Sequence, residues 1–456
     1  TYFCDGARSR AMEKDYSWTP EGGHFLADRH DRVYSGSVVE HILVEHLTQF
    51  FNVGEHNIIR LEDADWNDGL DMARDRGESV AFTAFYGGNL LALADLLDGL
   101  AAAKGIKVIR LAAEIKALLD SLTGISIDYD DPQAKHKFLF ETYFPSVQPS
   151  VSGAQEEVSV KKIAEDLRRK GNWIFDHIRT NEMVAVERDG RTDHWFNGYY
   201  DNKGKRLEGV EDDRVRMTLI GQVFPIMSGL AGAQEIKSVA AAVTAYLKDA
   251  RFGGLRLNTD LGRPHYLDLG RAFGFAYGTK ENGAFFNHMS VMYAYALYKR
   301  GFVREGYEAL DAIYRMCAES GKSKIYPGIP EYFDAQGRGR YHYLTGSASW
   351  LVLLKLTEVF GVKGDKGDLR LAPKLVQEEF DPKTGSASVT SRFAGKKVIV
   401  TYENPRKLDF GTYKIAKVFL NGDPLDMADG PADAVTIPRA AIEDTPLECT
   451  VKITLG

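Results

Sequence analysis

Cysteine is scarce in this sequence, and charge of one sign never accumulates in a long run. The three cysteines, Cys4, Cys317 and Cys449, lie far apart and lack the spacing of metal ligands. This argues against a disulfide framework and favours a reducing compartment, so we expect a cytoplasmic protein. The formal net charge of −7 is spread along the chain, and the sequence therefore predicts neither nucleic acid nor a membrane as partner.

The sequence also lacks a recognisable targeting segment. We expect no membrane-spanning helix, because no apolar run approaches the ~20 residues that a bilayer requires. Residues 1–6 contain neither an initiator methionine nor a signal-peptide pattern, so we expect the chain to be part of a longer protein. With 456 residues and 44% hydrophobic content, it can form one large domain or two moderate ones.

Helical periodicity dominates the first 360 residues and then gives way to alternation. We therefore expect a helical domain over residues 1–363 and a small antiparallel β domain over residues 364–456. Long connections rich in glycine, aspartate and aromatic residues separate the expected helices, which suits a toroid of helical hairpins whose loops meet at one end. The expected helices are 38–51, 79–97, 108–122, 160–178, 219–230, 238–247, 288–298, 305–317 and 346–360.

Residues 62–79 form the most informative segment of the chain. Seven carboxylates, Trp66 and two glycines fall within these eighteen positions. An indole gives an apolar platform for a sugar ring, acids and amides bond its hydroxyls, and an acid held partly out of water can protonate a glycosidic oxygen. The alternative is an acidic surface loop that caps the next helix, because Asp, Asn and Gly favour turns.

Three further segments make a family resemblance specific. They are Lys-Glu-Asn-Gly-Ala-Phe-Phe-Asn-His at 280–288, Tyr-Leu-Thr-Gly-Ser-Ala-Ser-Trp at 343–350 and Val-Thr-Tyr-Glu-Asn-Pro at 400–405. Together with Asp-Trp-Asn-Asp-Gly at 65–69, they resemble glycoside hydrolase family 94, the inverting β-glucoside phosphorylases. The resemblance extends from about residue 60 to residue 405. It implies an (α/α)6 barrel followed by a small β domain.

The resemblance implies that Asp68 is the general acid. Trp66 would line the donor sugar, and Asp65 would fix the loop or a sugar hydroxyl. Inorganic phosphate would attack the anomeric carbon in place of a base-activated water, and α-glucose 1-phosphate would leave with inverted configuration. The reaction would be reversible and would require neither a metal nor an organic cofactor.

Residues for phosphate follow from the same resemblance. The Thr345 hydroxyl, the Gly346 backbone N–H at an expected helix start and the His288 imidazole can supply the donors that a dianion needs. His288 could instead cap its helix or bond a core carbonyl, and Thr345 is also a good N-cap. Capping and phosphate binding are compatible.

Four other residues match positions that hold sugar in the family. Lys280 and Glu281 correspond to sugar-binding positions, and Lys280 could also add positive charge near the phosphate. Gln222 matches a family Gln ahead of a helix. Glu331 lies in Pro-Glu-Tyr at 330–332, similar to a family Glu-Pro-Tyr segment near the acceptor, although the first two residues are exchanged.

The sequence departs from the family pattern at its start. Neither the family's amino-terminal β-sandwich nor its Arg-Asp pair for the donor sugar occurs before Arg60. We therefore expect an incomplete barrel that a missing amino-terminal segment of the same protein completes, and a homodimer by analogy with relatives.

The acid loop is most similar to the β-1,2-oligoglucan phosphorylase branch. Its substrates would be a β-gluco-oligosaccharide and inorganic phosphate. Three alternatives stay open: a cellobiose- or cellodextrin-type phosphorylase, an inverting hydrolase and a non-catalytic carbohydrate-binding subunit. The hydrolase requires a second carboxylate about 6.5 to 9.5 Å from Asp68, for which Glu281 and Glu331 are the candidates.

Overall fold

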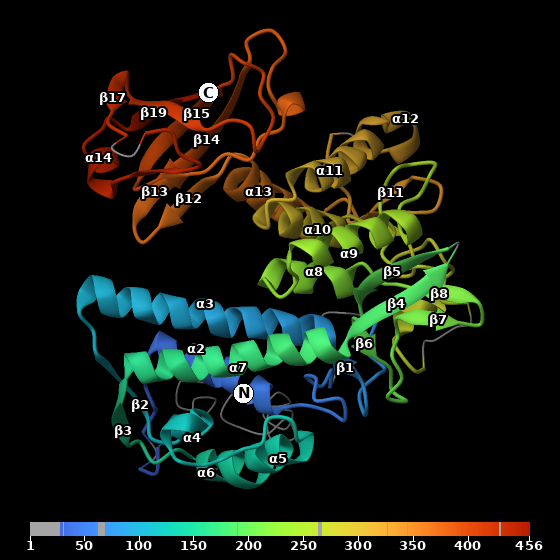
Figure 1. Ribbon diagram of the computed structural model, residues 1–456, viewed down its shortest axis with the longest axis vertical. Coiled ribbons are helices and arrows are strands. Elements are labelled where there is room, and N and C mark those ends of the chain that lie inside the picture. The colour runs from blue at the N-terminus through green and yellow to red at the C-terminus, as the bar shows by residue number, and fades with distance from the viewer. Residues whose placement is uncertain are drawn as a thin grey trace. The chain divides into compact units, whose positions relative to one another are not determined.

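The computed structural model describes most of the chain, as two compact units (Figure 1). The amino-terminal unit comprises Thr1–Ala242 and Thr259–Ala276, and the carboxy-terminal unit comprises Val243–Asn258 and Tyr277–Gly456. The described residues are 28–30, 32–62, 69–148, 150–188, 190–262, 267–325, 327–343, 345–427 and 430–456.

Long helices form the core of the amino-terminal unit. Helix α3 lies along α7, and it also packs against α8 (Figure 1). The close approach of α3 and α7 depends on glycine, because a Cβ on Gly171 would lie 3.0 Å from the carbonyl oxygen of Gly87. The helices of this part of the chain are α2 (Val38–Phe51), α3 (Val80–Lys104), α4 (Ile115–Leu118), α5 (Pro132–Lys137), α6 (Phe144–Val147), α7 (Val160–Asn181), α8 (Ile220–Ser228) and α9 (Ala233–Tyr246).

Local signals explain where α3 begins and ends. The Ser79 hydroxyl accepts a hydrogen bond from the Phe82 N–H at 3.0 Å and caps the first turn. Gly105 ends the helix in the left-handed conformation with φ of 67°, which glycine adopts without steric cost. The helix therefore extends seven residues beyond the predicted end at residue 97.

The expectation that no apolar stretch approaches the length of a membrane span is wrong for α3. This helix of 25 residues is apolar and long enough to cross a bilayer by length and composition alone. Half of its most apolar window is buried inside the protein, and the core helix of a soluble protein has the same properties.

Strands replace helix or loop at two places in the amino-terminal unit. Residues 108–122 were expected to be helical, but β2 (Val108–Ala112) pairs with β3 (Gln155–Ser159). The β-branched residues at 108 and 109 favour a strand, and a short apolar run does not distinguish the two structures. The stretch 194–214, between the expected helices 160–178 and 219–230, likewise contains paired strands. These are β5 (Arg191–Phe196) with β4 (Met183–Arg188), β6 (Tyr199–Tyr200) with β1 (Glu78–Ser79), and β7 (Gly209–Glu211) with β8 (Arg214–Arg216).

The carboxy-terminal unit begins with helices and a small sheet. Helix α10 (Asn287–Lys299) packs against α11 (Val303–Ala318) and α13 (Gly346–Leu354). α13 continues as a π-helical turn over Lys355–Val359, and α12 (Ser320–Ser323) follows α11. Strand β10 (Tyr332–Phe333) pairs with β9 (Phe285–Phe286) and with β11 (Gly339–Arg340), and the pairing of β10 with β9 joins two segments that are far apart in the sequence.

Two sheets, in which most strand pairs are antiparallel, lie in the chain from Val362 onward. One has the order β12-β13-β18 and the other the order β14-β15-β19-β16-β17. Strand β15 pairs with β19 in parallel and with β14 antiparallel. The strands are β12 (Val362–Asp365), β13 (Asp368–Leu371), β14 (Ser386–Phe393), β15 (Lys396–Glu403), β16 (Ile415–Leu420), β17 (Asp423–Leu425), β18 (Val435–Ile437) and β19 (Glu448–Leu455), with α14 (Arg439–Glu443) between the last two.

Part-buried hydrogen bonds connect this β region to the helices of its unit. The Tyr402 hydroxyl donates to the carbonyl of Phe360 at 2.5 Å, and the Lys374 amine donates to the carbonyl of Tyr298. The thiols of Cys317 and Cys449 are buried and unpaired with each other. The chain thus has a helical part and a β part, whereas the (α/α)6 toroid stays a prediction.

Candidate functional site

The acidic segment is described only at its two ends. Asp65, Trp66 and Asp68, the predicted acid loop residues, lie outside the described residues. Before the gap, the Asn52 side chain donates to the Glu62 carboxylate at 3.2 Å. Across the gap, the Leu61 N–H donates to the Gly77 carbonyl at 2.9 Å, and this bond joins the two flanks of the segment.

A second contact fixes the residues that directly follow Asp68. Gly270 lies so close to this flank that a Cβ there would stand 2.3 Å from the carbonyl carbon of Gly69. The Met72 N–H donates to the carbonyl of Leu269 at 2.9 Å. Asp71 accepts from the Arg271 backbone N–H at 2.9 Å. The backbone at residues 269–271 therefore supports the segment that begins next to the predicted acid.

Glu78 closes the acidic segment and has a structural environment. Its carboxylate is buried and accepts from the backbone N–H groups of His56 and Ile58 at 3.1 and 3.2 Å. Its Oε2 also lies 2.5 Å from Nδ1 of His56, whose ring stacks on Tyr200. These bonds hold residues 54–58 against the start of α3.

Gln222, predicted to bind sugar, is wholly buried in the amino-terminal unit. Its carbonyl oxygen accepts from the Phe196 N–H at 3.0 Å, and its amide nitrogen donates to the Phe196 carbonyl at 2.9 Å. The same nitrogen donates to the Thr218 carbonyl at 3.3 Å. Because these bonds use both ends of the amide, the structure supports a packing role for Gln222 rather than contact with a sugar.

Lys280 and Glu281 lie in a tight turn of the carboxy-terminal unit. The Gly278 N–H donates to the Asn282 carbonyl at 2.7 Å, and the buried Asn258 amide accepts from the Gly283 N–H at 2.8 Å. Lys280 has a φ of 50°, a left-handed conformation that is uncommon outside glycine. Its amine lies 5.4 Å from the ring centre of Tyr341, whose own φ is 47°.

Four predicted residues come together at the start of α13. Glu331 lies between Thr345 and His288: the Thr345 hydroxyl donates to Oε2 of Glu331, and Nδ1 of His288 lies 3.9 Å from Oε1. Gly346 packs against the imidazole, because a Cβ there would lie 2.7 Å from Cε1 of His288. The predicted phosphate residues therefore form one cluster, which we call the α13 cluster.

Strand pairing explains why these residues meet. Strand β10 pairs with β9, so the Asn287 N–H donates to the Glu331 carbonyl at 2.8 Å, and His288 follows in the first turn of α10. Thr345 caps α13 by accepting from the Ser347 N–H at 3.1 Å. The sequence placed Glu331 beside the acceptor sugar, whereas the structure places its side chain in the α13 cluster.

Burial changes the ionisation of the two titratable groups in the α13 cluster. It lowers the pKa of the His288 imidazole, because the charged ring loses hydration. Burial also raises the pKa of Glu331, and the negative charge of Glu281 adds to this increase. A hydrogen bond from Ser347 acts in the opposite direction. The cluster therefore favours a neutral imidazole and a carboxyl group that keeps its proton more readily than an exposed glutamate.

The α13 cluster has the chemistry of an anion site. It combines a hydroxyl, an imidazole and the first backbone N–H groups of a nine-residue helix, whose positive dipole end attracts negative charge. Sequence reasoning did not assign Ser347, whose hydroxyl lies 3.5 Å from Glu331 Oε2. It also missed Tyr341, whose carbonyl accepts from the Glu331 N–H at 2.7 Å. The position of Ser347 in the Thr-Gly-Ser motif could have indicated its place in the cluster, but no local sequence signal indicated that of Tyr341.

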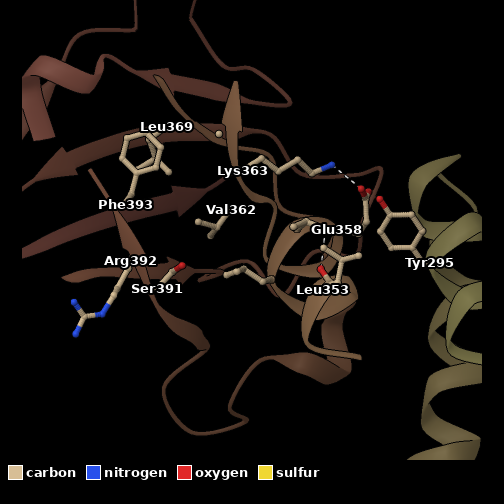
Figure 2. A pocket seen from close by; sticks show the side chains of 12 residues that line it. Tyr295, Leu353, Glu358, Val362, Lys363, Leu369, Ser391, Arg392 and Phe393 are labelled. Carbon is tan, nitrogen blue, oxygen red and sulfur yellow. Dashed lines mark hydrogen bonds and ion pairs between the residues drawn. The ribbon is translucent and has the colours of Figure 1, made fainter. Parts of the chain in front are cut away.

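A separate cleft lies between the helices and the β region of the carboxy-terminal unit. Its volume is about 420 Å³, and none of the predicted site residues lines it. Figure 2 shows Lys363 reaching toward Glu358, next to Tyr295 of α10, while Phe393 lies beside Leu369 on the opposite side. The Lys363 amine is 2.6 Å from the buried Glu358 carboxylate, so this contact closes one wall of the cleft.

Comparison with protein families confirms the resemblance. Residues 175–361 match the Glycosyl hydrolase 94 superfamily, catalytic domain. The acid loop residues lie outside this range. All the other predicted site residues lie within it: Gln222, Lys280, Glu281, His288, Glu331, Thr345 and Gly346.

Several characterised proteins are similar to the chain at low identity. The chain is 25% identical to cellobionic acid phosphorylase of Neurospora crassa, over 49% of its own length and 30% of that protein. It is 24% identical to 3-O-β-D-glucopyranosyl-β-D-glucuronide phosphorylase of Paenibacillus borealis, over 48% and 29% respectively. It is 20% identical to solabiose phosphorylase of Paenibacillus borealis, over 88% and 44%. The chain thus spans less than half the length of each of these relatives.

Proposed function

We propose that this chain is part of a glycoside phosphorylase that transfers a terminal β-linked glucosyl unit to inorganic phosphate. The products would be α-glucose 1-phosphate and an oligosaccharide one unit shorter. The similarity to the catalytic domain of the family and to proteins named as phosphorylases supports this reaction class. The α13 cluster is the single observation that carries the proposal.

The α13 cluster would supply what a phosphorylase requires and a hydrolase does not. In phosphorolysis, phosphate itself attacks the anomeric carbon, so the protein needs a cradle for a dianion instead of a second carboxylate base. Thr345, Gly346 and His288 lie close enough together that they would offer donors to phosphate oxygens from one place once the Thr345 hydroxyl is released from Glu331. Because burial lowers the pKa of His288, the ring would act on the anion as a neutral N–H donor.

Asp68 would complete the reaction as general acid. It would donate its proton to the glycosidic oxygen as the bond to the anomeric carbon breaks. Trp66 and Asp65 would line the donor site, with Lys280 and Glu281 holding sugar hydroxyls from the turn at 278–282. In the family-like arrangement, the helices would form part of an (α/α)6 toroid.

We further infer that the preferred substrate is a β-1,2-linked gluco-oligosaccharide. The support is the sequence of the acid loop, Arg-Leu-Glu-Asp-Ala-Asp-Trp-Asn-Asp-Gly at 60–69, together with Tyr-Pro-Gly-Ile-Pro-Glu-Tyr at 326–332. The named relatives act on other linkages or sugars by their printed names, so the linkage rests on these motifs.

Product analysis tests both the reaction and the linkage. The protein, with any further segments of its natural chain, is incubated with β-1,2-, β-1,3- and β-1,4-linked gluco-oligosaccharides, with and without inorganic phosphate. We expect α-glucose 1-phosphate only when phosphate is present, and fastest from the β-1,2 series. An Asp68→Asn variant should bind sugar but lose turnover. Product with the β configuration would contradict inversion.

An inverting hydrolase is the second candidate, because the half-buried Glu331 carboxyl could activate water. A raised pKa, as burial produces for Glu331, suits a general base working near neutral pH. Free glucose released without phosphate would favour this reading. The two outcomes are separated by the same product analysis.

A further inference from the structure

Glu331 occupies the position from which the α13 cluster would bind phosphate. Its carboxylate accepts a hydrogen bond from the Thr345 hydroxyl and lies 3.9 Å from Nδ1 of His288. The Ser347 hydroxyl is 3.5 Å from the same carboxylate. Two hydrogen bonds fix the backbone of Glu331. Its N–H donates to the Tyr341 carbonyl at 2.7 Å, and its carbonyl accepts from the Asn287 N–H at 2.8 Å. Only the side chain is thus left to move when another anion binds.

The hydroxyl of Thr345 cannot serve two anions at once. A threonine hydroxyl has a single hydrogen, and an ionised carboxylate, like phosphate, offers only acceptors. While Thr345 donates to Glu331, it cannot donate to phosphate. An ionised Glu331 would also repel the dianion across a half-buried site, where screening by water is weak.

We propose that Glu331 takes the place of phosphate when no anion is bound, and that it takes up a proton when the anion binds. Protonation removes its negative charge, frees the Thr345 hydroxyl and turns the carboxyl group into a donor toward an anion oxygen. The inference rests on the proposed phosphate site. It adds that anion binding is coupled to one proton.

The charged groups around Glu331 are consistent with proton uptake. His288 of α10 faces one oxygen, and Thr345 and Ser347 of α13 face the other. Glu281 adds negative charge, which raises the pKa of Glu331 together with burial.

Two cations lie on neighbouring segments. The Lys280 amine lies over the Tyr341 ring at 5.4 Å. On β11, the Arg340 guanidinium is 3.0 Å from the Asp334 carboxylate. A bound dianion would bring two further negative charges into this setting and would favour the neutral carboxyl group further.

Sulfate is the probe that isolates this effect. It is tetrahedral like phosphate but keeps two negative charges across the pH range of the experiment, so the ligand itself does not titrate. Calorimetric titrations with sulfate between pH 5.5 and 8.5, in buffers of different ionisation enthalpy, give both the affinity and the number of protons taken up. The wild-type protein is compared with Glu331→Gln.

We expect the wild-type protein to take up close to one proton per sulfate at alkaline pH. Its affinity should fall by up to about tenfold for each pH unit above the pKa of Glu331. For each sulfate bound, the uptake by Glu331→Gln should be up to one proton lower than that of wild type. At pH 8 the variant should bind sulfate about tenfold more tightly than wild type. Glu305→Gln, an exposed change at the start of α11, should behave like wild type.

The outcomes separate this inference from the proposed function. Saturable sulfate binding by wild type without proton uptake would overturn the role of Glu331 and leave the phosphate site standing. Equal uptake by wild type and Glu331→Gln would do the same. If neither sulfate nor phosphate binds wild type in a saturable manner, the phosphate site itself fails, and the inference fails with it. Because absence of proton uptake by the wild-type protein overturns the inference without any variant, poor folding of Glu331→Gln would not leave the inference untested.

Discussion

The imidazole of His288 lies directly against the backbone of Gly346, at the first residue of α13. A methyl group on that glycine would stand 2.7 Å from Cε1 and 2.9 Å from Nδ1 of the ring, closer than carbon and nitrogen atoms approach without bonding. The two residues come from helices whose first residues are 59 positions apart. The shape of the predicted anion site therefore depends on the absence of a side chain at residue 346.

Replacing this glycine should impair phosphate use more than folding. In Gly346→Ala, the new methyl group must push the His288 ring away from the helix start, so we expect the KM for phosphate to rise about tenfold or more. The KM for the oligosaccharide should change little. Phosphate-dependent release of glucose 1-phosphate at a series of phosphate concentrations gives both constants.

Gly321→Ala is the matched control for this variant. A Cβ at Gly321 meets no atom within 4 Å, so the control should retain wild-type constants. Unchanged phosphate KM in Gly346→Ala would show that the His288 ring is not held as the structure indicates.

A second glycine should matter for turnover. In Gly270→Ala, the new Cβ would lie 2.3 Å from the carbonyl carbon of Gly69 and 2.5 Å from the Leu70 nitrogen. Both are backbone atoms, so the strand of chain next to Asp68 must shift. Because a misplaced acid costs rate more than binding, we expect kcat to fall about tenfold or more with the phosphate KM nearly unchanged. Steady-state kinetics would check this, and a normal kcat would remove residues 269–271 from any role in positioning the acid.

The buried Glu358 carboxylate should contribute to stability of the carboxy-terminal unit. It accepts from the Lys363 and Lys374 amines, each at 2.6 Å, and its side chain is 2% exposed. Glu358→Gln leaves both lysines without their counter-charge, and we expect a loss of about 1–3 kcal/mol in the free energy of unfolding. The midpoint of urea unfolding measures it.

An exposed ion pair provides the comparison for that variant. Glu448 is 2.7 Å from Lys397, with side chains 56% and 50% exposed. Glu448→Gln should change stability by less than about 0.5 kcal/mol, because solvent screens such pairs. Equal effects of the two substitutions would mean that the Glu358 bridge stabilises no more than a surface pair.

Stability should also depend on pH through Glu208. Burial raises the pKa of this carboxyl group to about 8, although Thr218 donates to it through both its hydroxyl and its backbone N–H. The unfolded chain loses the same proton near pH 4.5. Between these pH values the folded protein binds more protons than the unfolded one, so stability falls as pH rises from about 4.5 to about 8 and is then constant.

Glu208→Gln should flatten this decline. Melting temperatures measured at intervals from pH 5 to pH 9 should fall with pH for wild type and vary less for the variant. If the two curves have the same slope, the proton carried by Glu208 does not account for the pH dependence.

Elements with strong local signals could be predicted from the sequence. α2 begins after Ser37, whose hydroxyl accepts from the Glu40 N–H, and its bounds match the expected 38–51. Strand β14 (Ser386–Phe393) lies in the region 364–456, where the alternation predicts β structure. In contrast, residues 108–112 form a strand that pairs with residues 155–159. The β-branched residues at 108 and 109 favour a strand, but the local sequence does not identify the distant partner that decides between strand and helix.

The residues of the candidate site likewise include some that could be predicted from the sequence and some that could not. Thr345 and Gly346 could be found because capping and motif lie in one short segment. The side chain of Glu331 could not be placed, because its contact with Thr345 follows from the pairing of β10 with β9. Gln222 matched the family position, yet only the structure shows that its amide is used by the backbone of Phe196.

The position of β19 sets the order in which the carboxy-terminal sheet can form. Its residues, Glu448–Leu455, lie between β15 and β16, which precede it in the chain. During synthesis, both of these strands must wait with open edges until residue 455 has left the ribosome. A transcript cut short before residue 448 would therefore yield a chain with two exposed strand edges, the kind of surface that drives aggregation.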